Sequence, residues 1–387
     1  MAGFLVIVGL TGSILVFNVN LERVFAHSLF ATPRPGVPRL DLSELAERAG
    51  QLVPHGRVYA VWMTEDDQAS IGFTARTDSV TGQPYDLGFD EFFVDPWTGN
   101  ELGRRHRGDL SEGLINLVPF IYELHWTLAL GDVGQWILGI LALVWTLDCF
   151  VGIYLALPLS RPGFWRRLRM AYRVKRGARG FRLHFDLHRA TGLWVWPLLV
   201  IFGWSSVMMN VRPIYEAVTS RVFDYESLPA AYTTNVRPND RPRLGWREAE
   251  RIAERLMAEQ ARVHGVTVGK PLTLMYFSDI GDYLYEVRGS GDVFERSPKG
   301  GGTEVMLDGD TGELRDFSQP TGEHVGNTIE SWLYALHMTR VFGMPYRILV
   351  CVLGGLVALL SVTGVVIWWK KREAPRLARA MRVPAAE

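Results

Sequence analysis

The sequence predicts a membrane α-helical protein with a four-helix transmembrane bundle and two small α+β domains outside the membrane. Of its 387 residues 48% are hydrophobic and 13 are tryptophan, which is too apolar for an ordinary soluble chain. Four apolar stretches, at roughly 2–19, 136–157, 191–211 and 346–369, approach or exceed the length of about 20 helical residues that crosses a hydrocarbon core. The two long segments between them repeat the same pattern of helix and strands.

The distribution of charge orients these crossings. The 41 basic and 41 acidic residues cancel, so nothing in the net charge indicates a nucleic-acid partner. The loop after the second crossing is rich in Arg and Lys and has no acidic residue from Leu159 to Phe185, and the tail from Lys370 is also basic. Because basic loops stay on the cytoplasmic side, both termini are predicted to be cytoplasmic.

The predicted domain boundaries follow from these crossings. In chain order they are helix 1 (1–25), an outer domain (26–112), an interfacial segment with helix 2 (113–158), a basic cytoplasmic loop (159–186), helix 3 (187–211), a second outer domain (212–328), an interfacial segment with helix 4 (329–370) and a cytoplasmic tail (371–387).

The first crossing starts at Met1 without a basic flank and reaches a polar residue at Asn18, so we expect it to be truncated at its N-terminus. A short tilted helix or a signal peptide are the alternatives. A signal peptide would need a positive n-region and a small-residue cleavage site, and the sequence has neither.

Each outer segment reads as a helix followed by strands that end in a D-x-x-T-G turn, at Asp95–Gly99 and Asp308–Gly312. The D-G-D-T-G run at 308–312 also suggests a calcium loop. The bidentate Glu of such a loop is replaced by Gln319, however, so the pattern favours a tight turn that uses Gly312.

Two histidines occupy equivalent positions before the second and fourth crossings. His125 lies in Y-E-L-H-W-T-L-A-L-G and His337 in Y-A-L-H-M-T-R-V-F-G, and both stand 32 residues before a cytoplasmic helix end. A single interfacial histidine is usually an amphipathic anchor. Two at equal depth on repeated helices are what bis-imidazole ligation of a haem iron requires, so we expect these two to be ligands.

Helix three begins with H-F-D-L-H-R, which places His184 and His188 four residues apart on one helical face at the cytoplasmic edge. A haem there would use His188 as one ligand and would need an imidazole from another helix, for which helix one is the symmetric source. No histidine precedes the first crossing, so the ligand is missing or the site is vacant. His184 is an accessory candidate or a residue at headgroup level.

Asp148 is the carboxylate well inside a predicted crossing, where acids are costly and are treated as functional by default. Three roles remain open for it: a structural hydrogen bond, for example to Thr363; a proton that compensates reduction of a cofactor; or a hydrogen bond to a ligating imidazole.

The motifs D-C-F-V-G-I-Y-L-A-L-P (148–158), H-F-D-L-H-R-A-T-G-L-W-V-W-P (184–197) and W-S-S-V-M-M-N (204–210) resemble the PepSY-associated transmembrane family over nearly the whole chain. The family includes iron-regulated inner-membrane proteins and FoxB-like siderophore reductases, with four helices and PepSY domains in the two periplasmic segments. The resemblance implies haem b ligated by His125, His337 and His188 in a bacterial inner membrane. It also implies electron transfer from an unidentified donor to a periplasmic ferric siderophore, which makes the chain a membrane ferric-siderophore reductase.

Two other classes of function remain as alternatives. PepSY modules also occur as binding or inhibitory domains for peptidases, so the chain would then be a membrane-tethered regulatory protein without redox chemistry. Matched histidines on helices two and four favour the reductase, because a binding protein does not need them. A transporter would need polar residues along a mid-membrane path, and apart from Asp148 the crossings offer few.

Overall fold

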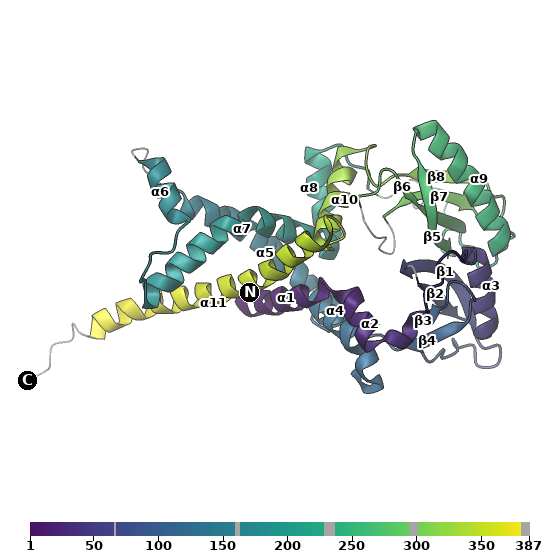
Figure 1. Ribbon diagram of the computed structural model, residues 1–387, viewed down its shortest axis with the longest axis horizontal. Coiled ribbons are helices and arrows are strands. Elements are labelled where there is room, and N and C mark those ends of the chain that lie inside the picture. The colour runs from purple at the N-terminus through teal and green to yellow at the C-terminus, as the bar shows by residue number, and fades with distance from the viewer. Residues whose placement is uncertain (66, 159–162, 228–236, 294–300, 381–387) are drawn as a thin grey trace, which may run out of the picture. The chain divides into compact units, whose positions relative to one another are not determined.

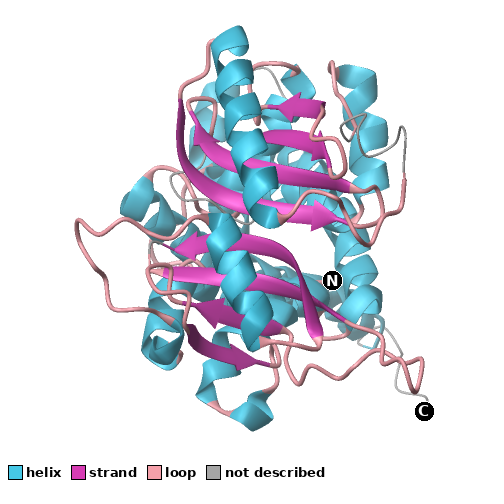
Figure 2. Cartoon of the chain, turned by 90° about the vertical axis from the view of Figure 1, so that its right-hand side faces the viewer, coloured by secondary structure: helices cyan, strands magenta, loops and turns pink. Residues whose placement is uncertain are grey.

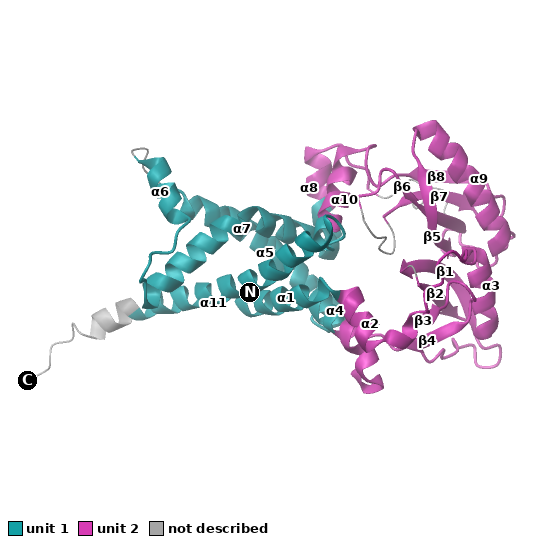
Figure 3. Ribbon diagram, in the orientation of Figure 1, with its two compact units in different colours: residues 1–17, 121–215, 336–387 teal, residues 18–120, 216–335 magenta. Residues whose placement is uncertain are grey.

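The structure is a computed structural model that describes residues 1–380 except 66, 159–162, 228–236 and 294–300. The chain divides into two compact units (Figure 3). We call residues 1–17, 121–215 and 336–387 the helical unit, and residues 18–120 and 216–335 the sheet unit.

Three helices are long and apolar enough to cross a membrane: α5 (Gly131–Ala156), α7 (Gly180–Asn210) and the part of α11 (Gly343–Ala380) up to Glu373. Helices α1 (Ala2–Leu15) and α2 (Asn18–Phe25) taken together are also long and apolar enough to cross a membrane, but the chain bends by 70° between them. The chain therefore has three candidate spans among its described residues, or four if the bent pair is one span. In the predicted first crossing at 2–19, the straight helix ends at Leu15, so a single span there would have to include the bend.

The helices of the helical unit pack in a chain of pairs: α1 against α11, α11 against α7, and α7 against α5 (Figure 1). Two glycines allow a close approach between α1 and α11. A Cβ on Gly9 would lie 2.7 Å from the carbonyl oxygen of Gly354, so the backbones of α1 and α11 touch there. The Ser13 hydroxyl donates to the Cys351 carbonyl at 2.7 Å, and Trp196 Nε1 of α7 donates to the Cys149 carbonyl of α5 at 2.8 Å. Close backbones and interhelical hydrogen bonds thus replace the hydrophobic driving force that lipid cannot supply.

The order of elements repeats along the chain (Figure 1). The first repeat runs α1, α2, α3 (Leu42–Leu52), four strands, α4 (Leu117–Thr127) and α5; the second runs α7, α8 (Arg212–Val222), α9 (Trp246–His264), four strands, α10 (Val325–His337) and α11. Short helix α6 (Phe164–Ala171) lies between the repeats, and 3₁₀ turns occupy His27–Leu29, Leu110–Glu112 and Leu114–Asn116.

The eight strands form one antiparallel sheet in the order β4-β3-β2-β1-β5-β6-β7-β8. The first repeat supplies β1 (Gly56–Glu65), β2 (Gln68–Ala75), β3 (Glu91–Val94) and β4 (Glu101–Arg105); the second supplies β5 (Val268–Phe277), β6 (Asp282–Gly289), β7 (Thr303–Asp308) and β8 (Leu314–Ser318). The two modules predicted as separate outer domains are therefore halves of one sheet. They join where Ala60, Val61 and Trp62 of β1 pair with β5.

Helices α3 and α9 lie side by side across one face of this sheet (Figure 2) and close a core shared by both halves. Leu45, Ala49 and Ile71 of the first half belong to the same buried cluster as Ala253 and Leu307 of the second. Each half also ends in the predicted tight turn. Gly99 and Gly312 have φ of +69° and +72°, a conformation in which glycine carries no steric cost.

The other face of the second half carries carboxylates. Glu286 and Glu304 are directly paired across β6 and β7, and Glu286 is fully buried. Glu286 accepts hydrogen bonds from Thr273 Oγ1 at 2.6 Å and from the Gly302 amide at 2.7 Å. Burial, and after it the neighbouring Glu286 charge, raises the pKa of Glu304 to about 8.

Candidate histidine sites in the helical unit

The structure brings His125 and His337 together. His125 is in the last turn of α4 and His337 is the last residue of α10, so each ends a short helix directly before a long apolar one. Their ring centroids are 6.4 Å apart, and the ring planes make an angle of 63°. The two residues that the sequence repeat singled out, 212 positions apart in the chain, thus face each other in one unit.

A hydroxyl group on α1 holds the His125 ring. Thr11 Oγ1 donates its proton to the Ile7 carbonyl at 2.7 Å and lies 3.0 Å from His125 Nδ1. In the Nδ1–H tautomer the hydroxyl oxygen accepts from the imidazole, and in the Nε2–H tautomer the hydroxyl donates to Nδ1. The ring also rests on Gly12, where a Cβ would lie 3.0 Å from His125 Cε1, so this position of α1 leaves room for the imidazole.

His337 is held in the same way by α7. Ser205 Oγ donates to the Phe202 carbonyl at 3.2 Å and lies 2.7 Å from His337 Nδ1. The Phe202 ring also packs against the imidazole, with 4.9 Å between centroids. Ser205 is fully buried, so this hydrogen bond satisfies a hydroxyl that has no access to water.

In the Nδ1–H tautomer of each ring, the hydroxyl accepts from Nδ1 and Nε2 carries the lone pair. This is the arrangement of metal-ligating histidines, where a second hydrogen bond fixes the tautomer and the orientation of the ring. Two imidazole nitrogens bound to one metal at about 2 Å each put their ring centroids roughly 6 Å apart. The observed 6.4 Å fits that separation, so the donor set suits axial ligation of a haem iron.

The backbone after each histidine is strained. In the described part of the chain, the non-glycine residues with positive φ are Leu128 and Ala129, shortly after His125, and Thr339 and Phe342, shortly after His337. Their φ values are between 53° and 57°, in the left-handed region, where each such residue costs roughly 1–3 kcal/mol. Strain of this kind persists where packing over-determines it, and it marks both histidine-bearing breaks as sites under constraint.

His188 forms a second site of a related kind. Its Nδ1 lies 3.0 Å from the Leu360 carbonyl and 3.1 Å from Thr363 Oγ1, both on α11. A carbonyl can only accept, so His188 is also an Nδ1–H tautomer with Nε2 available. Gly364 supports the ring, since a Cβ there would lie 3.3 Å from His188 Cε1. Within the residues that the structure describes, no ring contact joins His188 to a second imidazole.

The two accessory candidates, His184 and Asp148, have different surroundings. His184 Nδ1 is buried without a hydrogen-bond partner among the described residues, which leaves it open to a ligand. Asp148 is exposed on α5, and the hydroxyl suggested as its structural partner is used elsewhere. Thr363 Oγ1 donates to the Leu359 carbonyl at 2.7 Å and contacts His188 instead. The structure therefore shows no hydrogen bond between Asp148 and Thr363, and the other roles considered for Asp148 stay predictions.

The sequence prediction missed Thr11 and Ser205, the residues that orient the imidazoles. A signal for them exists in the repeat: Gly9-Leu10-Thr11 on α1 corresponds to Gly203-Trp204-Ser205 on α7. In both triplets the glycine makes a tight helix contact, Gly9 with Gly354 and Gly203 with Thr146, and the hydroxyl two residues later meets a histidine.

These features define a membrane protein with a repeated helix, sheet and helix arrangement and a matched histidine pair in its helical unit. The chain belongs to the PepSY-associated TM region family, whose sequence model matches residues 1–371. The predicted family membership is thereby confirmed. Among curated proteins, none matches the chain.

Proposed function

We propose that the chain is a haem-b-dependent electron carrier of the inner membrane that reduces a ferric chelate, of the siderophore class, on the periplasmic side. The observation that carries this proposal is the facing pair His125 and His337, each with Nδ1 hydrogen-bonded and Nε2 free, at 6.4 Å between ring centroids. A tethered binding protein has no use for two imidazoles prepared in this way.

The residues of the chain would act by holding and orienting. His125 and His337 would hold the haem iron, while Thr11 and Ser205 would orient the rings and, as acceptors from Nδ1, raise the basicity of the donor nitrogens. A haem held there supplies one-electron chemistry within a membrane. The Phe202 ring would cover one side of the His337 imidazole, and an apolar surrounding of this kind favours a stable low-spin centre.

The inner site would be built on His188, with His184 as an accessory group. His188 is oriented by the Leu360 carbonyl of α11, so it needs only a second axial ligand to complete the same kind of centre. The basic residues of α6 and of the start of α7 place this site on the cytoplasmic side in our proposal, with both termini inside.

The chemistry of iron supports a ferric chelate as the electron acceptor. Hard oxygen donors bind Fe³⁺ far better than Fe²⁺, so one electron delivered to a ferric chelate is enough to loosen the metal. A chain of this kind therefore needs no hydrolytic or group-transfer machinery.

The test is an oxidised-minus-reduced absorption spectrum of the detergent-purified full chain, with a pyridine haemochrome assay, on wild type and on His125→Ala and His337→Ala. We expect sharp low-spin b-type bands in wild type and their loss in both variants. His264→Ala, a histidine of α9 in the sheet unit, is the matched control and should keep the bands. Wild-type protein that carries no haem after expression with ample haem supply would overturn the proposal in favour of the tethered binding protein.

A further inference from the structure

A proline-rich loop precedes α3 in the sheet unit. It runs T-P-R-P-G-V-P-R-L-D over residues 32–41, and its three prolines restrict the backbone before any contact is made. Trp97 Nε1 donates to the Val37 carbonyl at 3.1 Å, and the Leu40 amide donates to the Pro96 carbonyl at 2.9 Å. The loop is therefore tied to the turn after β3 and is pre-formed rather than adaptable.

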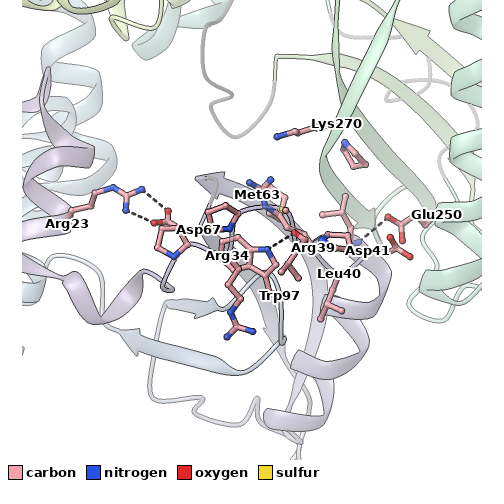
Figure 4. A pocket seen from close by; sticks show the side chains of 17 residues that line it. Arg23, Arg34, Arg39, Leu40, Asp41, Met63, Asp67, Trp97, Glu250 and Lys270 are labelled. Carbon is pink, nitrogen blue, oxygen red and sulfur yellow. Dashed lines mark hydrogen bonds and ion pairs between the residues drawn. The ribbon is translucent and has the colours of Figure 1, made fainter.

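This loop is one wall of a cleft of about 780 Å³ that lies wholly in the sheet unit (Figure 4). Met63 of β1 and Lys270 and Pro271 of β5 line the opposite side. The cleft opens where the seam between the halves ends, because β1 and β5 pair only from Ala60 to Trp62. Its volume is in the range of roughly 300–1,000 Å³ that is typical of small-molecule sites.

Two of the acids in the lining are already neutralised. Asp67 receives both guanidinium nitrogens of Arg23, at 2.6 and 2.7 Å. Glu250 reaches from α9 to the start of α3, where its two oxygens accept the amides of Leu42 and Ser43 at 3.1 and 2.9 Å. These carboxylates are therefore bound within the protein and oppose an incoming anion only weakly.

Positive charge and an aromatic ring share the rest of the lining. Arg39 holds its guanidinium carbon 5.9 Å from the centroid of the Trp97 ring, and Lys270 is exposed at the opposite side of the cleft (Figure 4). The lining as a whole holds four cations, Arg23, Arg34, Arg39 and Lys270, against three acids, Asp41, Asp67 and Glu250, and Arg34 pairs with Asp95 at 3.2 Å. An indole beside a planar guanidinium suits a ligand that has both flat rings and anionic oxygens.

We propose that this cleft binds an intact anionic metal chelate with aromatic oxygen donors, its rings against Trp97 and its charge between Arg39 and Lys270. The inference rests on the proposed function, in which such a chelate is the electron acceptor, and it assigns the acceptor's site and charge class. Within the described residues no group of three His, Cys, Asp or Glu side chains converges as a metal site. The cleft therefore recognises the outer surface of the chelate and leaves the metal with its chelator.

The experiment uses a chelate that cannot be reduced by one electron under these conditions. Binding of the trianionic gallium(III) tris-catecholate and of an uncharged gallium(III) tris-hydroxamate is measured by calorimetry on the detergent-purified full chain. We expect the tris-catecholate to bind, with Arg39→Gln and Lys270→Gln each weakening it about tenfold, the loss expected for one charge-assisted contact. Arg262→Gln, an exposed arginine at the end of α9, is the matched control and should change nothing.

Three results would overturn the inference: no binding of the tris-catecholate, equal binding by wild type and both cleft variants, or equally tight binding of the uncharged complex with the same sensitivity to the variants. Thermal melting of each variant checks that the fold is kept. Gallium binding does not depend on haem. Chelate binding without haem bands would sink the electron-transfer proposal alone, and haem bands without chelate binding would sink the cleft alone.

Discussion

The two histidine sites of the helical unit are prepared alike but are not equally complete. In both, Nδ1 is hydrogen-bonded and Nε2 is left free. His125 and His337 face each other from two repeats, whereas His188 meets no second imidazole in the described residues. A single contact with a neighbouring helix is therefore enough to orient one imidazole. Bringing two imidazoles together requires the repeat, which places two such contacts opposite each other.

The sites also differ in what holds the ring. A hydroxyl contacts Nδ1 of each of the three rings. His125 and His188 also have backbone hydrogen-bond partners, Val8 and Leu360, whereas His337 has the Ser205 hydroxyl. A backbone group cannot be removed by substitution. Side-chain changes should therefore separate the two sites.

The largest effect is expected from replacing an axial candidate by glycine. If the chain holds haem as proposed, His337→Gly should abolish the low-spin centre at His125 and His337, called the outer centre here, and added imidazole should restore it, because the Ser205 hydroxyl remains to orient the free base. Absorption and low-temperature magnetic resonance spectra would follow both steps. His188→Gly, treated in the same way, should leave the outer bands intact. Simultaneous loss of all bands in that variant would contradict the independence of the two sites.

A smaller effect is expected when the hydroxyls are removed. Thr11→Val with Ser205→Ala should weaken haem retention roughly 10–100-fold, as loss of a ligand-orienting hydrogen bond does elsewhere. Thr363→Val is the comparison variant, and it should change the His188 site little because the Leu360 carbonyl still accepts from Nδ1. Competition with apo-myoglobin would measure retention. If Thr363→Val cost as much as the double variant, the distinction between side-chain and backbone support would fail.

Substitution of two glycines should distinguish the two histidine sites further. Gly12→Ala would set a Cβ 3.0 Å from His125 Cε1, and Gly364→Ala would set one 3.3 Å from His188 Cε1. The neighbouring ring must move by a few tenths of an ångström in each case. We expect Gly12→Ala to shift the reduction midpoint of the outer centre and Gly364→Ala to leave it unchanged, as measured by redox titration. A shift of the outer midpoint in Gly364→Ala would show that the sites are coupled through α11.

The smallest effect on either site is expected from a change in the sheet unit. Glu304 has a folded pKa of about 8 against an ordinary value of 4.5, so the folded chain keeps a proton that the unfolded chain loses. The free energy of unfolding should therefore fall as pH rises between these values and be level above about pH 8. Glu304→Gln should make this slope shallower near pH 8 and raise the melting temperature above pH 8, while Asp282, whose pKa burial raises to about 6, keeps a slope at lower pH.

Thermal melting at about pH 5 and about pH 9 would measure that slope. Exposed Glu313→Gln is the control and should retain it. The haem spectrum should be the same in both variants, and a spectral change in Glu304→Gln would contradict the separation of the two units.

Much of this organisation could be predicted from the sequence, because it depends on local periodicity. Apolar runs locate α5, α7 and α11, and equal spacing in two repeats locates His125 and His337. The bend after Leu15 could not be predicted, since the run stays apolar through Phe17. Thr11 and Ser205 are also hard to recognise, because a small hydroxyl in an apolar helix usually bonds its own backbone, as both of these also do.

The sequence did not predict that the two modules of helix and strands form one sheet, and the reason is different. It depends on pairing between Ala60–Trp62 and β5, more than two hundred residues away in the chain, and neither strand carries a local signal of its partner. The cleft beside the end of that pairing was missed with it. Sequence periodicity indicates which face of a strand is buried, but it does not identify the neighbouring strand.

That seam has a consequence for any attempt to divide the protein. A chain cut to one repeat would expose β1 or β5 as a bare edge, and would also uncover the shared core under α3 and α9. Unpaired edges of this kind attract other strands and lead to aggregation. Each half of the sheet thus covers the edge strand of the other. We therefore expect a single repeat to aggregate and the two joined repeats to stay unaggregated.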